Sequence, residues 1–335
     1  MKSKPAAPIS LDLDNKWSYL MVHAEPSWVD YPSYLPTLVP RVLDFLDERD
    51  LKITFFIVGK DATLPGHAEL LAEIARRGHR IANHSHDHKP WLHRYTPREF
   101  SEELRRAEEA IEAATGVRTI GFRGPGFSLT NEVIAELAAR NYAYDATVFP
   151  NVLNPLSRAY YFRTTKLSPE ELEERSALFG KVSDAFRPNS PFRWRLRGPQ
   201  DLLEIPVTTF PGLRTPTHLS YLGYLGGKLR PLASLYYRMA LALTRATRNP
   251  PSMLLHPLDF LGSDDDSDLG FFPGMDMPSG RKIELAHHFL DMLGSRYRLV
   301  PMEEYAAGLV PRKTRVPNYS GASERRTSSR LIGSR

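Results

Sequence analysis

The segment RIANHSHDHKP, residues 80–90, places three histidines and an aspartate within five consecutive positions. His84 and His88 are four residues apart, and on a helical turn this spacing puts both imidazoles on one face, where they can share a cation. A carboxylate from another strand end would complete a site that leaves positions open for water and substrate. A solvated polar turn explains an isolated His-rich loop equally well, so the rest of the chain must decide between the two.

Four other segments place polar or ionisable groups directly after apolar, strand-like runs. They are VHAEPSW (22–28), GFRGPGF (121–127), YDATVFP (144–150) and LLHPLDF (254–260). In α/β folds, the loops that follow the carboxyl ends of the strands form the functional sites. Five such segments in one chain therefore favour a metal site over a polar turn.

The elements that must position these groups alternate between strands and helices over about 130 residues. The sequence predicts a first strand at 17–23 (WSYLMVH), then strands at 51–59, from residue 80, at 117–123 and at 142–150, with helices between them. The helix at Thr96–Thr115 carries a capping box, with Thr96 as N-cap and Glu99 three residues later. This alternation predicts a parallel α/β sheet, either open or closed into a barrel.

Residues 155–250 interrupt the alternation, which then resumes with a strand at PSMLLHPLDF and a helix at GRKIELAHHFLDMLGSR. We interpret this block as a large insertion within one domain that spans residues 1–312. Within it, residues 221–248 form an apolar, Arg-bearing stretch that has two interpretations. It is either a helix packed on the barrel, or a helix that docks on the surface of a bilayer.

The composition is that of a globular protein, with 41% hydrophobic and 25% charged residues among 335. The net charge of +5 is concentrated in residues 313–335, which we expect to be a disordered basic tail rather than a nucleic-acid contact. The absence of cysteine excludes disulfides and thiolate metal sites. Because no signal-like segment or long apolar run is present, we expect a soluble cytoplasmic protein.

The ordered series TFF-x-VG, NH-[ST]-x-x-H, FR-x-P, YD-[AS] and LLH resembles the polysaccharide deacetylase family, also called the NodB-homology family or carbohydrate esterase family 4. The resemblance covers roughly residues 17–150 and 250–305. It implies an α/β fold, a distorted (β/α)7-type barrel, here with the large insertion before the last strands. It also implies hydrolysis of an N-acetyl group from an amino sugar, with one divalent metal held by an acidic residue and two histidines.

The resemblance assigns roles residue by residue. His84 and His88 are expected to be the imidazole ligands, Arg123 to orient the catalytic base, and His256 to protonate the leaving amine. Asp145 is expected to hold or tune His256. Three neighbouring residues are expected to support these groups: Ser85 and Pro125 by shaping the loops, and Asp259 as a rival of Asp145.

The first motif of the family departs from the usual pattern of two adjacent aspartates, one a base and one a metal ligand. The matching strand end was expected at VHAE, which makes Glu25 the metal carboxylate and puts Ala24, which cannot take a proton, before it. In branches that space the two acids one residue apart, His23 occupies the position of the base. The metal alone could instead activate the water, with His23 as a spectator. Asp30, from the same loop, is a third candidate for the role of His23.

The sequence thus predicts a metal-dependent hydrolase that removes an N-acyl group from an amino sugar or sugar polymer, with a lipid-linked amino sugar as one option. Two alternatives stay open: hydrolysis of a small or cyclic amide, and a non-catalytic carbohydrate-binding relative, which Ala24 favours. Zinc suits two imidazoles and a carboxylate, although cobalt, nickel and manganese accept the same ligand types. Six further histidines are expected to be surface or structural groups: His67, His79, His86, His93, His287 and His288.

Overall fold

The computed structural model describes residues 4–165, 167–175, 182–196 and 201–309. The basic tail expected at 313–335 lies outside the described residues.

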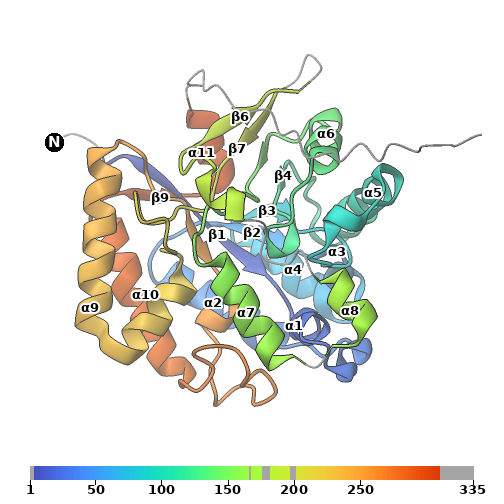
Figure 1. Cartoon of the computed structure of the whole chain (residues 1–335), viewed down its shortest axis with the longest axis horizontal. Helices are drawn as coiled ribbons and strands as arrows, with labels where there is room; N and C mark the ends of the chain where they lie inside the picture. The colour runs from blue at the N-terminus through green and yellow to red at the C-terminus, as the bar shows by residue number, and fades with distance from the viewer. Residues whose placement is uncertain (1–3, 166, 176–181, 197–200, 310–335) are drawn as a thin grey trace, which may run out of the picture.

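A curled sheet forms the centre of the molecule, and helices surround it (Figure 1). Its strands run in the order β6-β7-β5-β4-β3-β2-β1-β8, and β9 also pairs with β1. Every pairing in the sheet is parallel except that of β6 with β7. The strands are β1 (Ala6–Leu13), β2 (Thr54–Ile57), β3 (Arg80–Asn83), β4 (Gly121–Phe122), β5 (Tyr144–Asp145), β6 (Phe192–Trp194), β7 (Leu202–Glu204), β8 (Met253–Leu255) and β9 (Arg298–Val300).

The row from β7 to β8 contains seven parallel strands among the described residues, as a distorted (β/α)7-type barrel requires. Strands β7 and β8 at the two ends of this row have no ladder between them. Just outside their paired segments, the amide of Thr208 donates to the carbonyl of Ser252 at 3.3 Å, and the amide of Ser252 donates to the Thr208 hydroxyl at 2.8 Å. These two bonds link the two ends of the curled sheet, and the predicted fold class is confirmed.

Helices connect the successive parallel strands and cover the outside of the sheet (Figure 1). They are α1 (Lys16–Val22), α2 (Leu35–Asp47), α3 (Gly59–Thr63), α4 (His67–Arg76), α5 (Pro97–Thr115), α6 (Asn131–Ala139), α7 (Asn154–Thr164), α8 (Pro169–Glu174), α9 (Leu219–Ala246), α10 (Ser279–Gly294) and α11 (Met302–Gly308), with 3-10 helices η1 (Pro26–Asp30), η2 (Leu92–Arg94), η3 (Pro125–Phe127), η4 (Val182–Phe186) and η5 (Pro257–Asp259). The largest buried cluster joins β1 and β2 to side chains of α2, α9 and α10.

The strand predicted at 17–23 is wrong, because these residues form helix α1. The first strand is instead β1, which begins eleven residues before the predicted strand, and seven of its eight residues are buried. Asn15 is the N-cap of α1, because its side chain accepts a hydrogen bond from the amide of Lys16 at 2.8 Å. The carboxyl end of β1 is therefore at LDLD rather than at VHAE.

The block at 155–250 is partly built into the sheet. Its segment DLLEIPVT contains β7, which pairs in parallel with β5. Residues 168–186 contain α8 and η4, and residues 176–181 between them lie outside the described part. Within the long helix α9, Leu229 has non-helical angles (φ −152°, ψ 84°), and Pro231 follows it, so α9 bends at this point.

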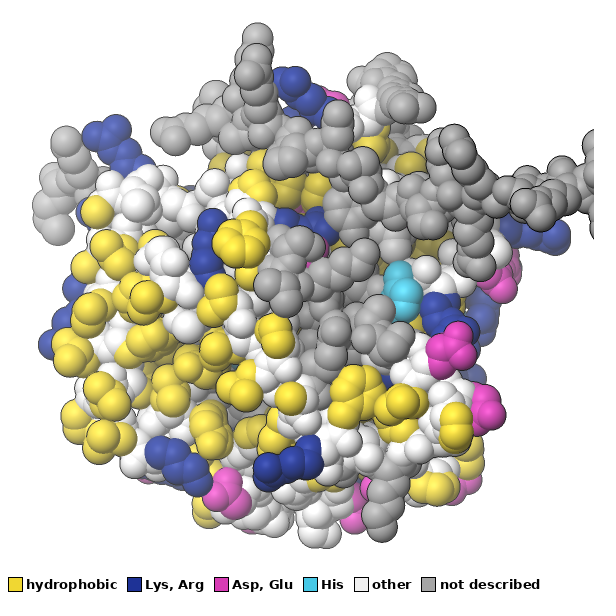
Figure 2. All heavy atoms as spheres, in the orientation of Figure 1, with side chains coloured by type: hydrophobic (Ala, Val, Ile, Leu, Met, Phe, Trp, Pro, Cys, Tyr) yellow, Lys and Arg dark blue, Asp and Glu magenta, His cyan; other side chains and the backbone are white. Residues whose placement is uncertain are grey.

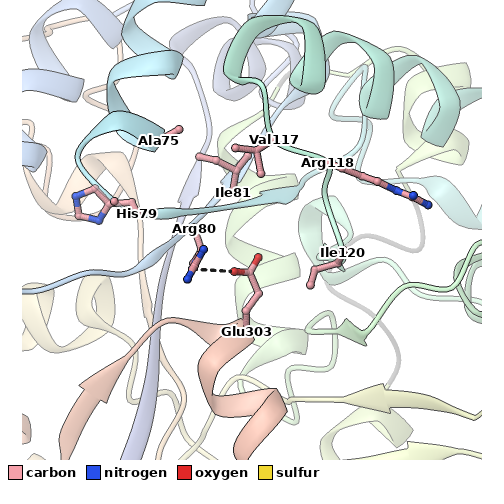
Figure 3. Close-up of a pocket in the computed structure, with 9 residues that line it drawn as sticks. Ala75, His79, Arg80, Ile81, Val117, Arg118, Ile120 and Glu303 are labelled. Carbon is pink, nitrogen blue, oxygen red and sulfur yellow. Dashed lines mark ion pairs between the residues drawn. The ribbon is translucent and has the colours of Figure 1, made fainter.

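A hollow of about 400 Å³ lies at the amino-terminal edge of the sheet (Figure 3). It is lined by residues that precede or begin β3, by Val117–Ile120 before β4, and by Glu303 of α11, whose carboxylate pairs with Arg80 at 3.4 Å. None of the predicted site residues lines it. Since functional loops follow the carboxyl ends of the strands, this hollow is on the wrong edge for the predicted chemistry.

The predicted capping box of α5 is confirmed. The Thr96 hydroxyl accepts from the amide of Glu99 at 3.2 Å, and the Glu99 carboxylate accepts from the amide of Thr96 at 2.7 Å.

Replacing this cap tests how strongly it stabilises α5. Thr96→Ala should lower the free energy of unfolding by about 1 kcal/mol, because one of the first amides of the helix loses its partner. Urea denaturation followed by circular dichroism measures the change. The exposed Glu112→Ala on the same helix is the control, and it should change stability by less than about 0.5 kcal/mol. Equal effects of the two substitutions would contradict this role of the cap.

Candidate metal centre

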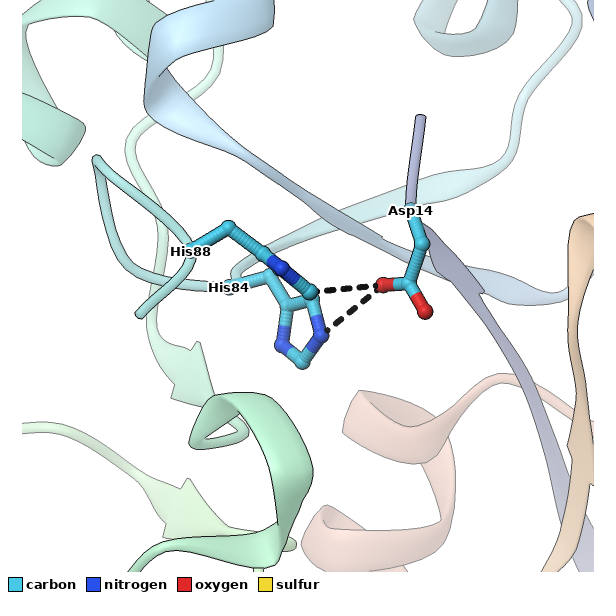
Figure 4. A group of neighbouring side chains, drawn as sticks. All are labelled: Asp14, His84 and His88. Atoms are coloured by element: carbon cyan, nitrogen blue, oxygen red, sulfur yellow. Dashed lines mark hydrogen bonds and ion pairs between the residues drawn. The ribbon is translucent and has the colours of Figure 1, made fainter. Parts of the chain in front are cut away.

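Asp14, His84 and His88 converge at the carboxyl ends of β1 and β3 (Figure 4). One carboxylate oxygen of Asp14 lies 3.2 Å from Nε2 of His84 and 3.0 Å from Nε2 of His88. The potential ligand atoms of the three residues all lie within 4.8 Å of one another, and all three residues are buried. Two imidazoles and one carboxylate form the donor set that zinc and related divalent ions accept in hydrolases.

The tautomer of His84 fits a metal ligand. Its Nδ1 lies 2.7 Å from the carbonyl oxygen of Arg123. Because a carbonyl can only accept, Nδ1 carries a proton, so Nε2, which faces Asp14, is the ring nitrogen that can bind a metal ion once its own proton is displaced. A ring held in this way through its far nitrogen is typical of histidines that bind metal.

The two histidines meet on a loop rather than on the helical turn predicted from their spacing. Ser85 and His88 both have left-handed backbone angles, with φ of 63° and 50°. The loop is held from two sides. Asn83 Oδ1 accepts from the amide of Ser85 at 2.8 Å, and Ser85 Oγ accepts from the amide of His88 at 3.1 Å, which is the loop-fixing role expected of Ser85.

Glu103 of α5 holds the outer side of the same loop, and sequence reasoning missed it. Its buried carboxylate accepts from the amides of His86 and Asp87 at 2.8 and 2.7 Å. Burial raises its pKa, and only these loop amides and Arg106 oppose that shift. Glu103 is thus a positioning residue for the loop between the two candidate ligands.

The electrostatics of the centre favour a cation. Burial alone would raise the pKa of Asp14, but His88 and then His84 lower it well below its ordinary value by charge and hydrogen bonding. Burial lowers the pKa of His84, while Asp12 and Asp14 more than offset this and raise it. The anionic carboxylate is thus held opposite two imidazoles in a buried space, where a divalent ion can replace their protons.

Asp12 is on β1, two residues before Asp14, which directly follows the strand, and it forms a buried ion pair with Arg123. The Arg123 guanidinium also donates to Ser10 Oγ at 3.0 Å and to the carbonyl of Ala146 at 2.9 Å. The second oxygen of Asp12 lies 3.9 Å from Nε2 of His84. Arg123 therefore orients a carboxylate beside the candidate metal ligands, as expected for the arginine of this motif.

His256 follows β8 and is fixed through its backbone and its ring. Its amide donates to Oδ2 of Asp259 at 2.8 Å, and its Nδ1 lies 3.1 Å from Ser220 Oγ at the start of α9. Its ring centroid is 5.8 Å from that of His218, whose pKa is lowered to about 3 by burial and then by the charge of His256. His218 is therefore neutral near pH 7.

Tyr19 of α1 connects the two sides of the centre and was not foreseen. Burial, followed by the charges of Asp14, Tyr34 and Asp259, raises its pKa well above the ordinary value. Because β1 and β8 pair in parallel, their carboxyl ends, followed by Asp14 and His256, lie at the same edge of the sheet.

The structure does not bring Glu25 or His23 into this group, which corrects their expected roles. Glu25 is exposed at the start of η1, and Asp14 takes the place expected for it beside the imidazoles. The ring of His23 stacks on Phe271 with centroids 3.7 Å apart. Both residues follow helix α1 rather than a strand end, and the exposed Asp30 lies further along the same loop. The signal that could have identified Asp12 and Asp14 is the alternating run ISLDLD.

Asp145 has partners other than those expected. Its Oδ1 accepts from Thr147 Oγ1 at 2.6 Å, and it is registered opposite Glu204 across the β5–β7 pairing. Glu204 in turn accepts from the amide of Val148 and the indole of Trp194, both at 2.9 Å. The supporting contact to His256 is made by Asp259, the rival residue, while Asp145 belongs to a buried carboxyl pair.

Most of the six remaining histidines have structural partners. His67, His79 and His86 are buried. Nδ1 of His79 accepts from the amide of Ile53 at 3.3 Å. His287 contacts Arg49, and His288 contacts Ser234, while His93 is exposed.

Taken together, the curled parallel sheet and the Asp–His–His group at its carboxyl edge define an α/β protein with a candidate centre for hydrolytic metals. Residues 14–145 match the sequence model of the polysaccharide deacetylase family, and this part of the chain belongs to that family. The match begins at Asp14 and includes both histidines and Arg123.

Three comparisons show how far the similarity extends. A chitooligosaccharide deacetylase from Bradyrhizobium is 35% identical over 79 residues, 24% of this chain and 35% of that protein. A peptidoglycan-N-acetylglucosamine deacetylase from Bacillus cereus is 30% identical over 95 residues, 28% of this chain and 34% of that protein. The chain thus matches about a third of the length of these curated relatives. The crystal structure of a putative polysaccharide deacetylase from Mycobacterium smegmatis shares the fold, with a TM-score of 0.59 and 21% identity over 94% of this chain and 95% of that one.

The carboxyl pair of Asp145 and Glu204 predicts a pH dependence of stability. Burial raises the pKa of both groups, so the native state retains a proton that the unfolded chain releases above about pH 4. The contribution of the pair is therefore fully present below about pH 4 and is lost as the pH rises through the native pKa values.

Asp145→Asn should flatten this dependence, because the amide can donate to Glu204 and let it ionise with three donors around it. Urea denaturation at a series of pH values between about 5 and 8 measures the slope. The exposed Glu112→Gln is the control and should keep the slope of the natural chain. Parallel stability curves for Asp145→Asn and the natural chain would show that the pair does not share a proton.

Proposed function

We propose that the chain is a metal-dependent hydrolase that removes an N-acyl group, N-acetyl in the simplest case, from an amino sugar or a polymer of amino sugars. The observation that supports this proposal is the convergence of Asp14, His84 and His88 beside the Asp12–Arg123 pair. The named relatives are deacetylases of chitooligosaccharides and of peptidoglycan N-acetylglucosamine, which suggests the substrate class.

The residues present fit a divalent ion, and zinc is the metal that we propose for them. Asp14, His84 and His88 would hold it, with the Nδ1 bond of His84 to the backbone fixing one ring. Such an ion supplies Lewis-acid chemistry to a carbonyl group and to water.

Asp12 is the base in this proposal. Its carboxylate, oriented by Arg123, takes a proton from the attacking water. The alternative of a non-catalytic relative depended on Ala24 in the position of the base, and Asp12 on β1 removes the reason for it.

His256 is the acid in this proposal. Its Nδ1 faces Ser220, so Nε2 is the atom that can carry a proton to the departing amine. Asp259 fixes the backbone of His256, and the ring of the neutral His218 lies beside it.

Metal content distinguishes the proposed ligands Asp14 and His84 from Glu25, which lies outside the group. Asp14→Asn and His84→Ala should each lose most of the bound zinc, because the buried donor set loses an anion or a lone pair. Elemental analysis of purified protein measures the metal. Glu25→Gln is the matched control at the residue first expected to bind the ion, and it should retain the metal content of the natural chain. Zinc loss in Glu25→Gln with retention in Asp14→Asn would refute the assigned ligand set.

Turnover separates the ligands from the proton-transfer groups. Asp12→Asn and His256→Ala should keep their zinc and lose about 10²–10⁴-fold in kcat, because each removes one proton transfer. Acetate release from N-acetylglucosamine oligomers is the readout, and the exposed His93→Ala is the control. Full turnover in His256→Ala would exclude it as the acid. If the zinc-loaded chain cleaves only small or cyclic amides, the proposed sugar substrate is wrong and the proposed metal site stands.

A further inference from the structure

Helix α9 exposes a continuous apolar face to solvent. After the bend at Leu229, the side chains of Leu232, Leu235, Met239 and Leu243 are 59%, 49%, 52% and 38% exposed. Their spacing of three, four and four residues places them along one side of the helix. Large side chains exposed singly are common on protein surfaces, but a row of four along one helix indicates an interaction surface.

The opposite face of α9 accounts for its packing on the molecule. Tyr237 packs against Phe289 of α10 with ring centroids 5.9 Å apart, and the Thr244 hydroxyl lies 2.8 Å from that of Tyr297. Packing on the barrel, one of the two interpretations open from the sequence, is therefore satisfied by the inner face. The exposed apolar side chains on the outer face take no part in this packing, so another partner must cover them.

The charges of α9 indicate the nature of that partner. Between Leu219 and Ala246 the helix carries four basic side chains and no acidic one. They are Lys228, Arg230, Arg238 and Arg245. Figure 2 shows the apolar side chains gathered on the side of the molecule where Figure 1 places α9, with Lys and Arg side chains at the margin.

Two occupants could cover an apolar face of this size: a second copy of the chain, or a lipid surface. A second copy would bring an equally basic, acid-free helix against the first, and like charges would oppose the contact. Anionic headgroups complement the arginines while the acyl region receives the leucines, as in helices that lie in the membrane interface. No helix among the described residues has the length and hydropathy to span a bilayer, so the contact would be peripheral.

We propose that the outer face of α9, defined by Leu232, Leu235, Met239, Leu243 and the flanking arginines, docks on an anionic bilayer. The same helix begins at the candidate site, where Ser220 contacts the ring of His256 and His218 lies beside it. Docking would therefore hold the site next to the lipid surface. The consequence for substrate, an N-acyl amino sugar carried on a lipid, rests on the proposed hydrolase function.

Vesicle flotation of the full chain tests the docking without any catalysis. The probes are vesicles of equimolar phosphatidylcholine and phosphatidylglycerol, and vesicles of phosphatidylcholine alone. The natural chain should float with the anionic vesicles and far less with the neutral ones. The double variant Leu235→Glu/Met239→Glu should bind the anionic vesicles at least about tenfold more weakly, because two exposed apolar side chains no longer enter the interface.

Matched controls lie on helices on the other side of the view in Figure 1. Leu172→Glu on α8 replaces a leucine that is 52% exposed, and Arg98→Glu on α5 is the counterpart of Arg238→Glu on α9. The α8 and α5 variants should float like the natural chain, and Arg238→Glu should float several-fold less. Thermal unfolding verifies that the variants are folded.

Three outcomes would overturn the docking. The natural chain does not float, or the double variant floats equally well, or light scattering shows that the natural chain is a dimer and the double variant a monomer. Zinc-loaded protein and a lipid-linked N-acetylglucosamine in the same vesicles extend the test to the substrate. The double variant should lose turnover of this lipid several-fold and retain turnover of soluble oligomers. Flotation without turnover of either substrate would overturn the proposed function and leave the docking, whereas turnover without flotation would do the reverse.

Discussion

The buried guanidinium of Arg123 is the constraint around which the centre is organised. A fully buried cation is tolerated only when it is paired, and removing one partner from such a pair costs about 3–5 kcal/mol. Arg123 meets this requirement with Asp12 and Ser10 on β1 and the carbonyl of Ala146 after β5, and its guanidinium lies over the ring of Phe56 on β2. One side chain directly after β4 thus contacts β1, β2 and the segment after β5. Its carbonyl also holds the ring of His84.

Because Arg123 contacts both Asp12 and His84, it fixes the position of the carboxylate relative to the imidazole. The side chain of Arg123 orients the carboxylate of Asp12, and its backbone oxygen sets the tautomer of His84, whose Nε2 faces Asp14. Asp12 is near the end of β1 and Asp14 directly follows that strand, and both carboxylates lie near Nε2 of His84. The proposed base and a candidate metal ligand therefore come from one short segment, and Arg123, directly after β4, contacts both sides of the centre.

The sequence allowed prediction of the fold class, because strand–helix alternation is a local pattern. The His and Arg motifs are local too, and they singled out His84, His88, Arg123 and His256 as candidate site residues. It misplaced the first strand because WSYLMV is short and apolar, and such a run fits a strand as well as a buried helix. That error moved the expected carboxylate from Asp14 to Glu25. The pairing of Asp145 with Glu204 joins segments distant in sequence, so no local pattern could have revealed it.

The bend in α9 links the centre to the outer surface. Helix α9 begins beside His256, to which it contributes Ser220, and it packs along α10. Gly226 allows close packing before the bend, since a Cβ there would lie 3.0 Å from Leu285 and 3.1 Å from Phe289. The bend at Leu229 and Pro231 then redirects the helix, and the residues after it present leucines outward and Tyr237 inward. One helix thus carries both Ser220, beside His256, and the exposed apolar face proposed to dock on lipid. Burying that face would therefore restrain the end of the helix that contacts His256.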